Sequence, residues 1–163
     1  MRAFVAAAMI VLLAGCGFTP MYAPAGGGQA IGPVNVTMIE GKAGHVLKTE
    51  LDRILDVERG EGPPATLEIR LREDVSRLGI RLDESATRAE MRLTASYVLT
   101  PANGTPVRGA VYSIVNYDIP LAAFGEIAAQ DDARERAAET LAQRMRAELA
   151  IRLSQQRSQQ AAR

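Results

Sequence analysis

The sequence predicts an α/β domain, a two-layer sandwich with the element order β-α-β-β-β-α. Three segments alternate apolar and polar residues as strands do, and a fourth is apolar on both faces as a covered strand is. Two further segments repeat apolar residues every three or four positions as helices do. The chain has 163 residues, of which 47% are hydrophobic and 23% are charged. These fractions are typical of a globular protein, and the length suits one domain.

The first two predicted elements precede a break at residues 60–64 (GEGPP). Residues 34–39 (VNVTMI) alternate and are rich in β-branched side chains, which favours a strand. Residues 43–59 carry leucine and isoleucine at helical spacing, with charged residues on the other faces. We therefore expect a strand and then a helix, ended by the glycines and prolines that follow.

Three strands are predicted in succession after this break. Residues 66–75 and 89–99 alternate apolar and polar side chains, so each segment has one buried and one solvated face. A turn at 101–104 (PANG) leads to a strand over 107–119, whose apolar residues on both faces predict cover on both sides. Three strands joined by turns form a meander, and the first strand joins them through a crossover. The expected sheet is four-stranded and mixed.

A long helix over about 126–155 is the last predicted element. The segment is rich in helix-forming residues. Its apolar stripe consists of Ala133, Ala137, Leu141, Met145, Leu149 and Leu153. Because each predicted helix has a single apolar stripe, we expect both helices on one face of the sheet. Residues 156–163 are expected to form a disordered tail.

The N-terminus predicts export and lipid attachment. An apolar run at 3–13 has the length of a secretory signal and is too short to span a bilayer. It leads into Leu13-Ala14-Gly15-Cys16, which has the form of a bacterial lipoprotein box. Small residues fit the peptidase, and the Cys16 thiol accepts a diacylglyceryl group before its freed amine accepts an N-acyl chain. We therefore expect a signal peptide over 1–15.

Lipidation of Cys16 would hold the mature protein on a membrane without spanning it, because two or three acyl chains form a stable anchor. Gly17, in place of an aspartate, favours the periplasmic side of the outer membrane over retention at the inner membrane. Residues 16–32 are dense in Gly, Pro and Ala and predict a flexible tether. The folded domain is expected over 33–155.

Composition argues against several functional classes. A net charge of zero is unlike that of a nucleic-acid binder, which carries a basic excess. One histidine and one cysteine are too few for a multi-ligand zinc site. The acidic pairs are adjacent in sequence, so their side chains diverge, and the chain has no nucleophile motif or phosphate loop. The prediction is a non-enzyme without a cofactor, apart from the acyl groups on Cys16.

Three motifs occur in a fixed order: CGFTPMY at 16–22, TR at 87–88 leading into LTASYVL at 93–99, and AAQDDARERAA at 128–138. Together with the element order, they resemble the LPS-assembly lipoprotein LptE family, in particular its alphaproteobacterial type. The resemblance covers nearly the whole mature chain. It implies a plug inside the lumen of LptD, a large outer-membrane β-barrel, with a role in assembling that barrel and in binding lipopolysaccharide.

Arginine is the dominant cation, since all but Lys42 and Lys48 of the 19 basic residues are arginines. Arginine pairs bidentately with phosphate, which lipid A carries. Arginines in the second and third strands and in their loop are therefore candidates for lipopolysaccharide contacts. These candidates are Arg70, Arg72, Arg77, Arg81, Arg88 and Arg92. The alternative is a solvated face that neighbouring aspartates and glutamates neutralise.

Residues 76–88 (SRLGIRLDESATR) interleave three apolar residues with arginines. An exposed loop of this kind would suit an amphiphilic lipid. Equally, the segment can extend a long hairpin whose apolar residues complete the core. In the first case, the loop is expected to contact lipid A phosphates through Arg77, Arg81 and Arg88, and acyl chains through Leu78, Ile80 and Leu82.

Two rival functions are compatible with the sequence. One is another outer-membrane barrel-assembly lipoprotein or envelope structural lipoprotein with the same anchor. The other is a periplasmic enzyme with unrecognised chemistry. Co-purification with a large barrel distinguishes the LptE-type function from the first rival, and a depletion phenotype that does not depend on activity counts against the second.

Overall fold

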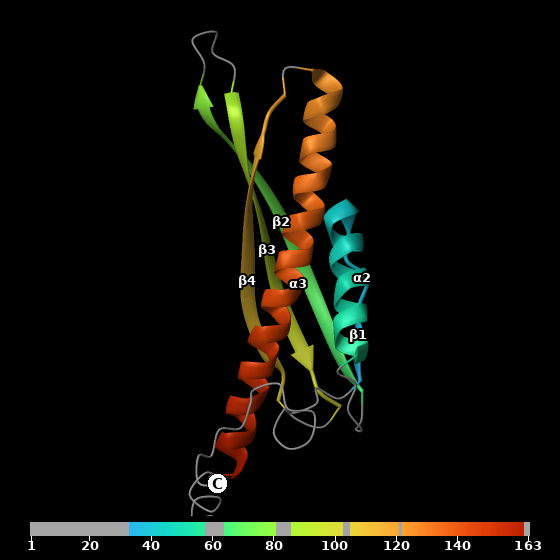
Figure 1. The fold of residues 1–163 in the computed structure, drawn as a ribbon. Coiled ribbons are helices and arrows are strands. Elements are labelled where there is room, and N and C mark those ends of the chain that lie inside the picture. The colour runs from blue at the N-terminus through green and yellow to red at the C-terminus, as the bar shows by residue number, and fades with distance from the viewer. Residues whose placement is uncertain (1–32, 58–63, 81–85, 103–104, 121, 162–163) are drawn as a thin grey trace, which may run out of the picture.

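The computed structural model describes residues 33–57, 64–80, 86–102, 105–120 and 122–161 (Figure 1). The elements are β1 (Val34–Val36), α2 (Gly41–Val57), β2 (Ala65–Ile80), β3 (Ala86–Thr100), β4 (Val107–Asp118) and α3 (Ala123–Ala161). This order confirms the predicted β-α-β-β-β-α sandwich. The predicted signal peptide (1–15), Cys16 and the predicted tether (16–32) lie outside the described residues.

The four strands form one mixed sheet in the order β1-β2-β3-β4. β1 runs parallel to β2, with Val34 opposite Ala65, and β2, β3 and β4 pair antiparallel. Parallel neighbours need a crossover connection, which α2 provides. The β2–β3 hairpin is long, because its register runs from the Thr66–Thr100 pair to the Ile80–Ala86 pair.

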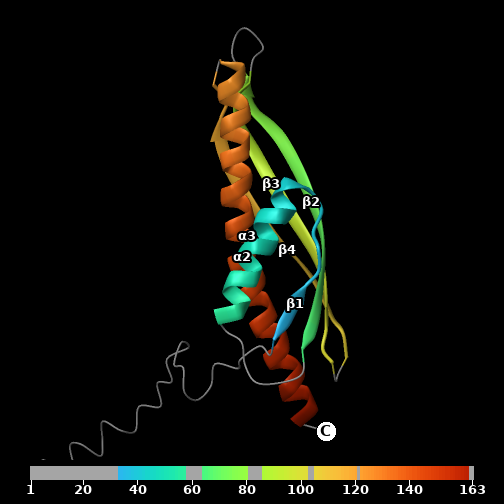
Figure 2. The same ribbon diagram turned by 90° about the vertical axis from the view of Figure 1, so that its right-hand side faces the viewer.

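Both helices pack on one face of the sheet, as predicted, and the hydrophobic core lies between the two layers (Figure 2). The inward residues of β3 are those that the alternation predicts: Met91, Leu93, Ala95, Tyr97 and Leu99, all buried. From α3, the predicted stripe is buried from Ala133 to Leu149. The buried Ser113 hydroxyl donates a hydrogen bond to the Ala137 carbonyl at 2.8 Å, which ties β4 to α3.

The β2–β3 hairpin is longer than the sequence predicts, since β2 continues past residue 75 to Ile80. The segment 76–88 is therefore mainly an extended hairpin. Leu78 does not complete the core, because it points to the face of the sheet opposite the helices, where it is 41% exposed. On the helix side Val75 is also 41% exposed, and a mismatch of lengths accounts for this. The 17 residues of α2 span about 25 Å, whereas the 16 residues of β2 span about 50 Å. The helix therefore leaves the far half of β2 uncovered.

β1 is shorter than predicted and ends at Val36 instead of residue 39. The Thr37 N–H and hydroxyl both donate to the Leu67 carbonyl, at 3.0 and 3.3 Å, and the chain then leaves the sheet. Ile39 turns into the core with 4% exposure. Gly41 begins α2 with a φ of 83°, a conformation that glycine adopts without strain.

α3 is longer than predicted at both ends. It begins at Ala123 instead of 126 and continues to Ala161, so the predicted end at 155 and the disordered tail from 156 are wrong over 156–161. Glutamine, alanine and arginine dominate this segment, and no glycine or proline interrupts it. At 39 residues α3 is about 58 Å long. The domain is therefore a rod, with α3 along its whole length (Figures 1 and 2).

Candidate functional site

One face of the sheet carries no covering element among the described residues, and we call it the outer face (Figure 2). Because side chains alternate along a strand, the even-numbered residues of β2, β3 and β4 point to this face. The expectation of cover on both faces of β4 is therefore wrong. Its outward Tyr112 stays 50% exposed. The outward arginines of the sheet are Arg70, Arg72, Arg88, Arg92 and Arg108.

No second layer of structure covers the Tyr112 ring among the described residues, but two guanidinium groups lie over it. Arg92 of β3 stands 5.2 Å from the centre of its ring, and Arg144 of α3 stands 5.9 Å from it. Arg144 also donates a hydrogen bond to the Tyr112 carbonyl at 2.7 Å. These cation–π contacts shield an aromatic side chain that would otherwise lie bare on an open sheet.

Three of the six predicted lipopolysaccharide contacts have carboxylate partners on the outer face. Arg72 pairs with Asp74 at 2.8 Å, Arg88 with Asp118 at 3.4 Å, and Arg92 with Glu90 at 3.5 Å. Their side chains are between 43% and 77% exposed, so each pair contributes little to stability. At these three positions the structure therefore fits the alternative drawn from the sequence, a solvated face whose arginines are neutralised by neighbouring carboxylates.

The other three candidates lie elsewhere. Arg77 points to the helix side of the sheet and pairs with Glu126 of α3 at 3.0 Å. Arg70 has no ion pair among the described residues and lies in the half of β2 nearer its start. Arg81 lies outside the described residues. The structure thus does not bring the six arginines together at one site.

The far end of the rod combines the end of the β2–β3 hairpin with the start of α3 (Figure 1). We call this region the tip. It exposes apolar side chains from both elements, including Leu78 at 41% and Phe124 at 89%. Val75 of β2 and Ile127 of α3 are exposed as well. The side chains of Ile80 and Leu82 are outside the described set.

The opposite end of the rod, the base, is where the described domain begins. The Ala65 N–H donates to the Pro33 carbonyl at 2.8 Å, so residue 33 lies beside the first residue of β2. β2 then runs from this base to the tip, over about 50 Å. The chain therefore enters the domain at the end opposite the exposed apolar side chains.

An ion-pair network joins α3 to the hairpin below the tip. Arg134 of α3 donates bidentately to Glu73 of β2, at 2.8 and 2.9 Å, and also to Asp131. Asp131 in turn accepts from Lys42 of α2 at 3.3 Å. The Arg134 side chain is only 15% exposed. The hydrogen bonds that Arg134 donates to Glu73 raise the pKa of Arg134 further above its ordinary value, so its charge is permanent.

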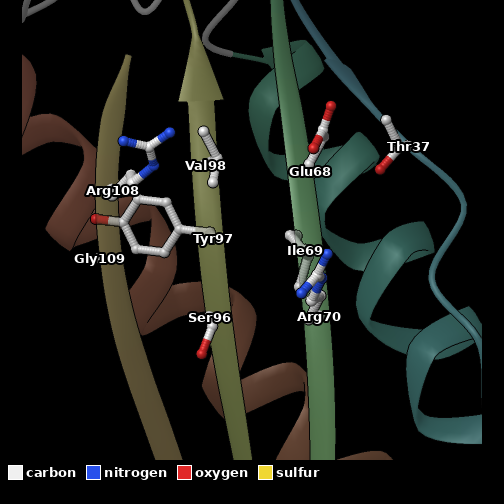
Figure 3. A pocket seen from close by; sticks show the side chains of 9 residues that line it. All are labelled: Thr37, Glu68, Ile69, Arg70, Ser96, Tyr97, Val98, Arg108 and Gly109. Carbon is white, nitrogen blue, oxygen red and sulfur yellow. The ribbon is translucent and has the colours of Figure 1, made fainter.

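Sequence reasoning noticed Arg134 only as part of the AAQDDARERAA motif, and Asp131 also as a member of an adjacent acidic pair. The signal for their role was not local, because Glu73 lies 61 residues away. Arg108 was also passed over. It lies on the outer face across β3 from Arg70, beside an open depression of about 630 Å³ (Figure 3).

Metal binding finds no support in the described ranges, which contain no cluster of three or more histidine, cysteine, aspartate or glutamate residues able to hold an ion. Within the same ranges, no helix is both long enough and apolar enough to cross a membrane.

Several solved structures of lipoproteins share this fold. A proposed lipoprotein of Caulobacter crescentus CB15 is 28% identical, with a TM-score of 0.57 over 74% of this chain and 90% of that chain. A minor lipoprotein of Acinetobacter baumannii is 16% identical, with a TM-score of 0.57 over 74% of this chain and 91% of that one. Rare lipoprotein B from Shewanella oneidensis is 12% identical, with a TM-score of 0.51 over 75% and 97%.

The second and third of these likenesses show the fold alone, because their sequence identities are low. No protein-family model matches the chain, and no curated protein matches its sequence. The comparisons thus place the fold among lipoproteins of the bacterial envelope, without identifying a partner or a ligand for this chain.

Proposed function

We propose that this chain is an outer-membrane lipoprotein of the LptE type, anchored through Cys16 on the periplasmic side. It occupies and helps assemble the LptD β-barrel and supports lipopolysaccharide transport, with direct binding of lipopolysaccharide at the tip. The observation that carries the proposal is the polarity of the rod. The chain enters at the base, and exposed apolar side chains stand beside arginines at the opposite end.

The anchor and the tip have separate tasks in this arrangement. The predicted tether after Cys16, the sixteen residues 17–32, would reach roughly 20–25 Å as a flexible chain, and it would keep the base close to the membrane that holds Cys16. The tip then projects about 50 Å further, the length of β2. A rod of this kind can reach into a barrel from its periplasmic mouth while its lipid anchor stays in the surrounding membrane.

The outer face suits a barrel lumen, because such lumens are polar. Along β3 its residues are arginine, glutamate, threonine, serine and one valine. Most of its charges form ion pairs on the face itself, so a polar wall can approach without leaving isolated charges buried. These features support a plug, and the identity of the barrel comes from the resemblance to LptE.

The tip suits an amphiphilic ligand. The side chains of Arg77 and Arg88 are 68% and 62% exposed. Each contacts one carboxylate, and a guanidinium has five N–H donors, so donors remain for a phosphate. Leu78 is exposed opposite Arg88 on the outer face. Phe124 is exposed at the start of α3, on the helix side of the sheet to which Arg77 points. Both offer surface for acyl chains. Arg81 is proposed as a third phosphate contact.

Reversing the charge of the tip tests lipopolysaccharide binding. The triple variant Arg77→Glu, Arg81→Glu, Arg88→Glu should keep its circular dichroism spectrum and its barrel partner and lose most lipopolysaccharide binding. The matched control changes three exposed helical arginines, Arg53→Glu, Arg136→Glu and Arg152→Glu, which alters the net charge equally. Binding is measured on the full chain in detergent at two salt concentrations, because exposed charges are screened. Equal affinity in the tip variant and the wild type contradicts the assignment.

The partner and the anchor are tested separately. Affinity purification of the full chain from detergent-solubilised outer membranes should recover a large barrel protein in stoichiometric amounts. Recovery without any barrel would favour another envelope lipoprotein. The Cys16→Ala variant should remain uncleaved and lack acyl chains by mass spectrometry. Normal cleavage and membrane retention of that variant would contradict the lipoprotein assignment.

A further inference from the structure

The outward arginines of the sheet fall into two groups. Arg72, Arg88 and Arg92 each have a carboxylate within 3.5 Å. Arg70 and Arg108 form no ion pair or hydrogen bond within the part of the chain that the structure describes. Carboxylates are abundant on the outer face. Arg70 and Arg108 therefore lack a partner among the described residues because of where they lie on the face.

Arg70 and Arg108 line the same open depression, which has a volume of about 630 Å³ (Figure 3). Arg70 belongs to β2 and stands opposite Ser96, and Arg108 belongs to β4 and stands opposite Val98. The two arginines therefore flank β3 diagonally, two strand spacings apart across the sheet and two residues apart along it, a separation of about 12 Å. Guanidinium groups on such long side chains can converge on one anion above β3.

The remaining lining defines what such an anion must carry. Val98 provides an apolar floor, and Ser96 and Thr37 provide hydroxyl groups. Glu68 adds a carboxylate, which has no ion pair of its own among the described residues. Two arginines and one glutamate leave a net charge of plus one. A carboxylate repels a bare anion and accepts hydrogen bonds from hydroxyl groups, so the lining favours a ligand that carries both groups.

We propose that this depression binds a phosphate ester attached to a hydroxyl-bearing group, such as a sugar phosphate or a glycerol phosphate headgroup. Arg70 and Arg108 hold the phosphate through charge-assisted hydrogen bonds. Glu68 and Ser96 contact the hydroxyl groups. The site is separate from the tip, because Arg70 and Arg77 are seven residues, or about 23 Å, apart along β2.

Titration calorimetry on the full chain in detergent tests the site with three probes: glucose 1-phosphate, sn-glycerol 3-phosphate and inorganic phosphate. Glucose is the uncharged control. We expect saturable binding of at least one ester with a millimolar dissociation constant, and none of glucose. Arg70→Gln and Arg108→Gln should each weaken that binding about fivefold, the effect expected for a partly exposed charge pair.

Two further variants make the test specific. Arg72→Gln removes an outward arginine of the same strand that is paired with Asp74, so binding should change less than about twofold. Glu68→Gln should strengthen the binding of inorganic phosphate, because a repelling charge is removed. The same variant should reduce the preference of the depression for the phosphate esters over inorganic phosphate. The tip variant Arg77→Glu, Arg81→Glu, Arg88→Glu should bind these probes unchanged, so failure at the tip and failure at this depression are distinguishable.

The probes also identify the source of the ligand. Tighter binding of glucose 1-phosphate indicates a saccharide, and tighter binding of sn-glycerol 3-phosphate indicates a phospholipid headgroup. The proposal is overturned if no ester saturates the protein below about 20 mM, a range in which a weak specific site is still detected. It is equally overturned if Arg72→Gln weakens binding as much as Arg70→Gln, which would show a general effect of surface charge.

Discussion

The base and the tip of the rod are made from the same strands and the same long helix but are built differently. At the base, the sheet is covered by α2 and α3, and residues such as Leu47, Leu67 and Leu99 are fully or almost fully buried. At the tip only α3 remains above the hairpin, and Val75 and Phe124 are exposed. The difference shows that apolar burial is concentrated at the base, while the tip leaves apolar side chains exposed.

The lengths of the two helices produce this difference. α2 is 17 residues long and α3 is 39, so α3 extends alone beyond the layer that α2 completes. The Arg134 network lies at the boundary, where Glu73 of the hairpin, Asp131 of α3 and Lys42 of α2 meet. The ion pairs of α2, α3 and the hairpin thus lie where α2 begins, at the edge of the part of the sheet that both helices cover.

The largest effect is expected from Leu141→Asp. Leu141 is completely buried between α3 and the sheet. An unpaired carboxylate there costs several kcal/mol, of the order of the whole stability of a domain this size. Thermal melts followed by circular dichroism should show a severely destabilised or unfolded protein. Gln143→Asp, at an exposed position of the same helix, is the control and should melt close to the wild type. A melting temperature of Leu141→Asp within a degree or two of the wild type would contradict this burial.

Arg134→Ala should destabilise the tip and leave the base unchanged. Its removal leaves Glu73 and Asp131 facing each other without the bridging cation, at a cost of about 1–3 kcal/mol. Hydrogen exchange should accelerate in the hairpin beyond residue 73 and stay unchanged in β3 near residue 97. Arg136→Ala removes an exposed pair with Asp132 one helical turn apart and should cost no more than about 0.5 kcal/mol. Uniform acceleration over both regions would show that the network does not define a boundary.

The sequence predicted the base far better than the tip, for a physical reason. Alternation along residues 89–99 identified five inward residues of β3, because one face of that strand is dry and the other is wet: Met91, Leu93, Ala95, Tyr97 and Leu99. It did not single out Ala89, which is also fully buried. Beyond residue 75 the partner layer is partly absent, so apolar and polar residues no longer alternate between two environments, and the end of β2 could not be read from the pattern.

The candidate site was predicted only in part, because its decisive contacts are not local. Arg70, Arg72 and Arg92 were placed correctly on the second and third strands. Arg77 and Arg88 lie in these strands instead of in the loop, and Arg81 lies outside the described residues. The partners of these arginines were not predicted. Arg77 pairs with Glu126, 49 residues away. Arg70 and Arg108 line one depression only because β3 lies between their strands. Spacing within one segment carries no information about such pairs.

The smallest stability effect is expected from Phe124→Ser, and it sharpens the contrast between the two regions. Phe124 is 89% exposed, so its ring buries almost nothing, and the free energy of unfolding should change by less than about 0.5 kcal/mol. Leu149→Ser, at a fully buried position of the same helix, should cost several kcal/mol through the cavity and the buried hydroxyl. If the tip binds an amphiphile, Phe124→Ser weakens lipopolysaccharide binding of the full chain in detergent and leaves the melting curve unchanged. A drop of several degrees in the melting temperature of Phe124→Ser would mean that the tip also stabilises the fold.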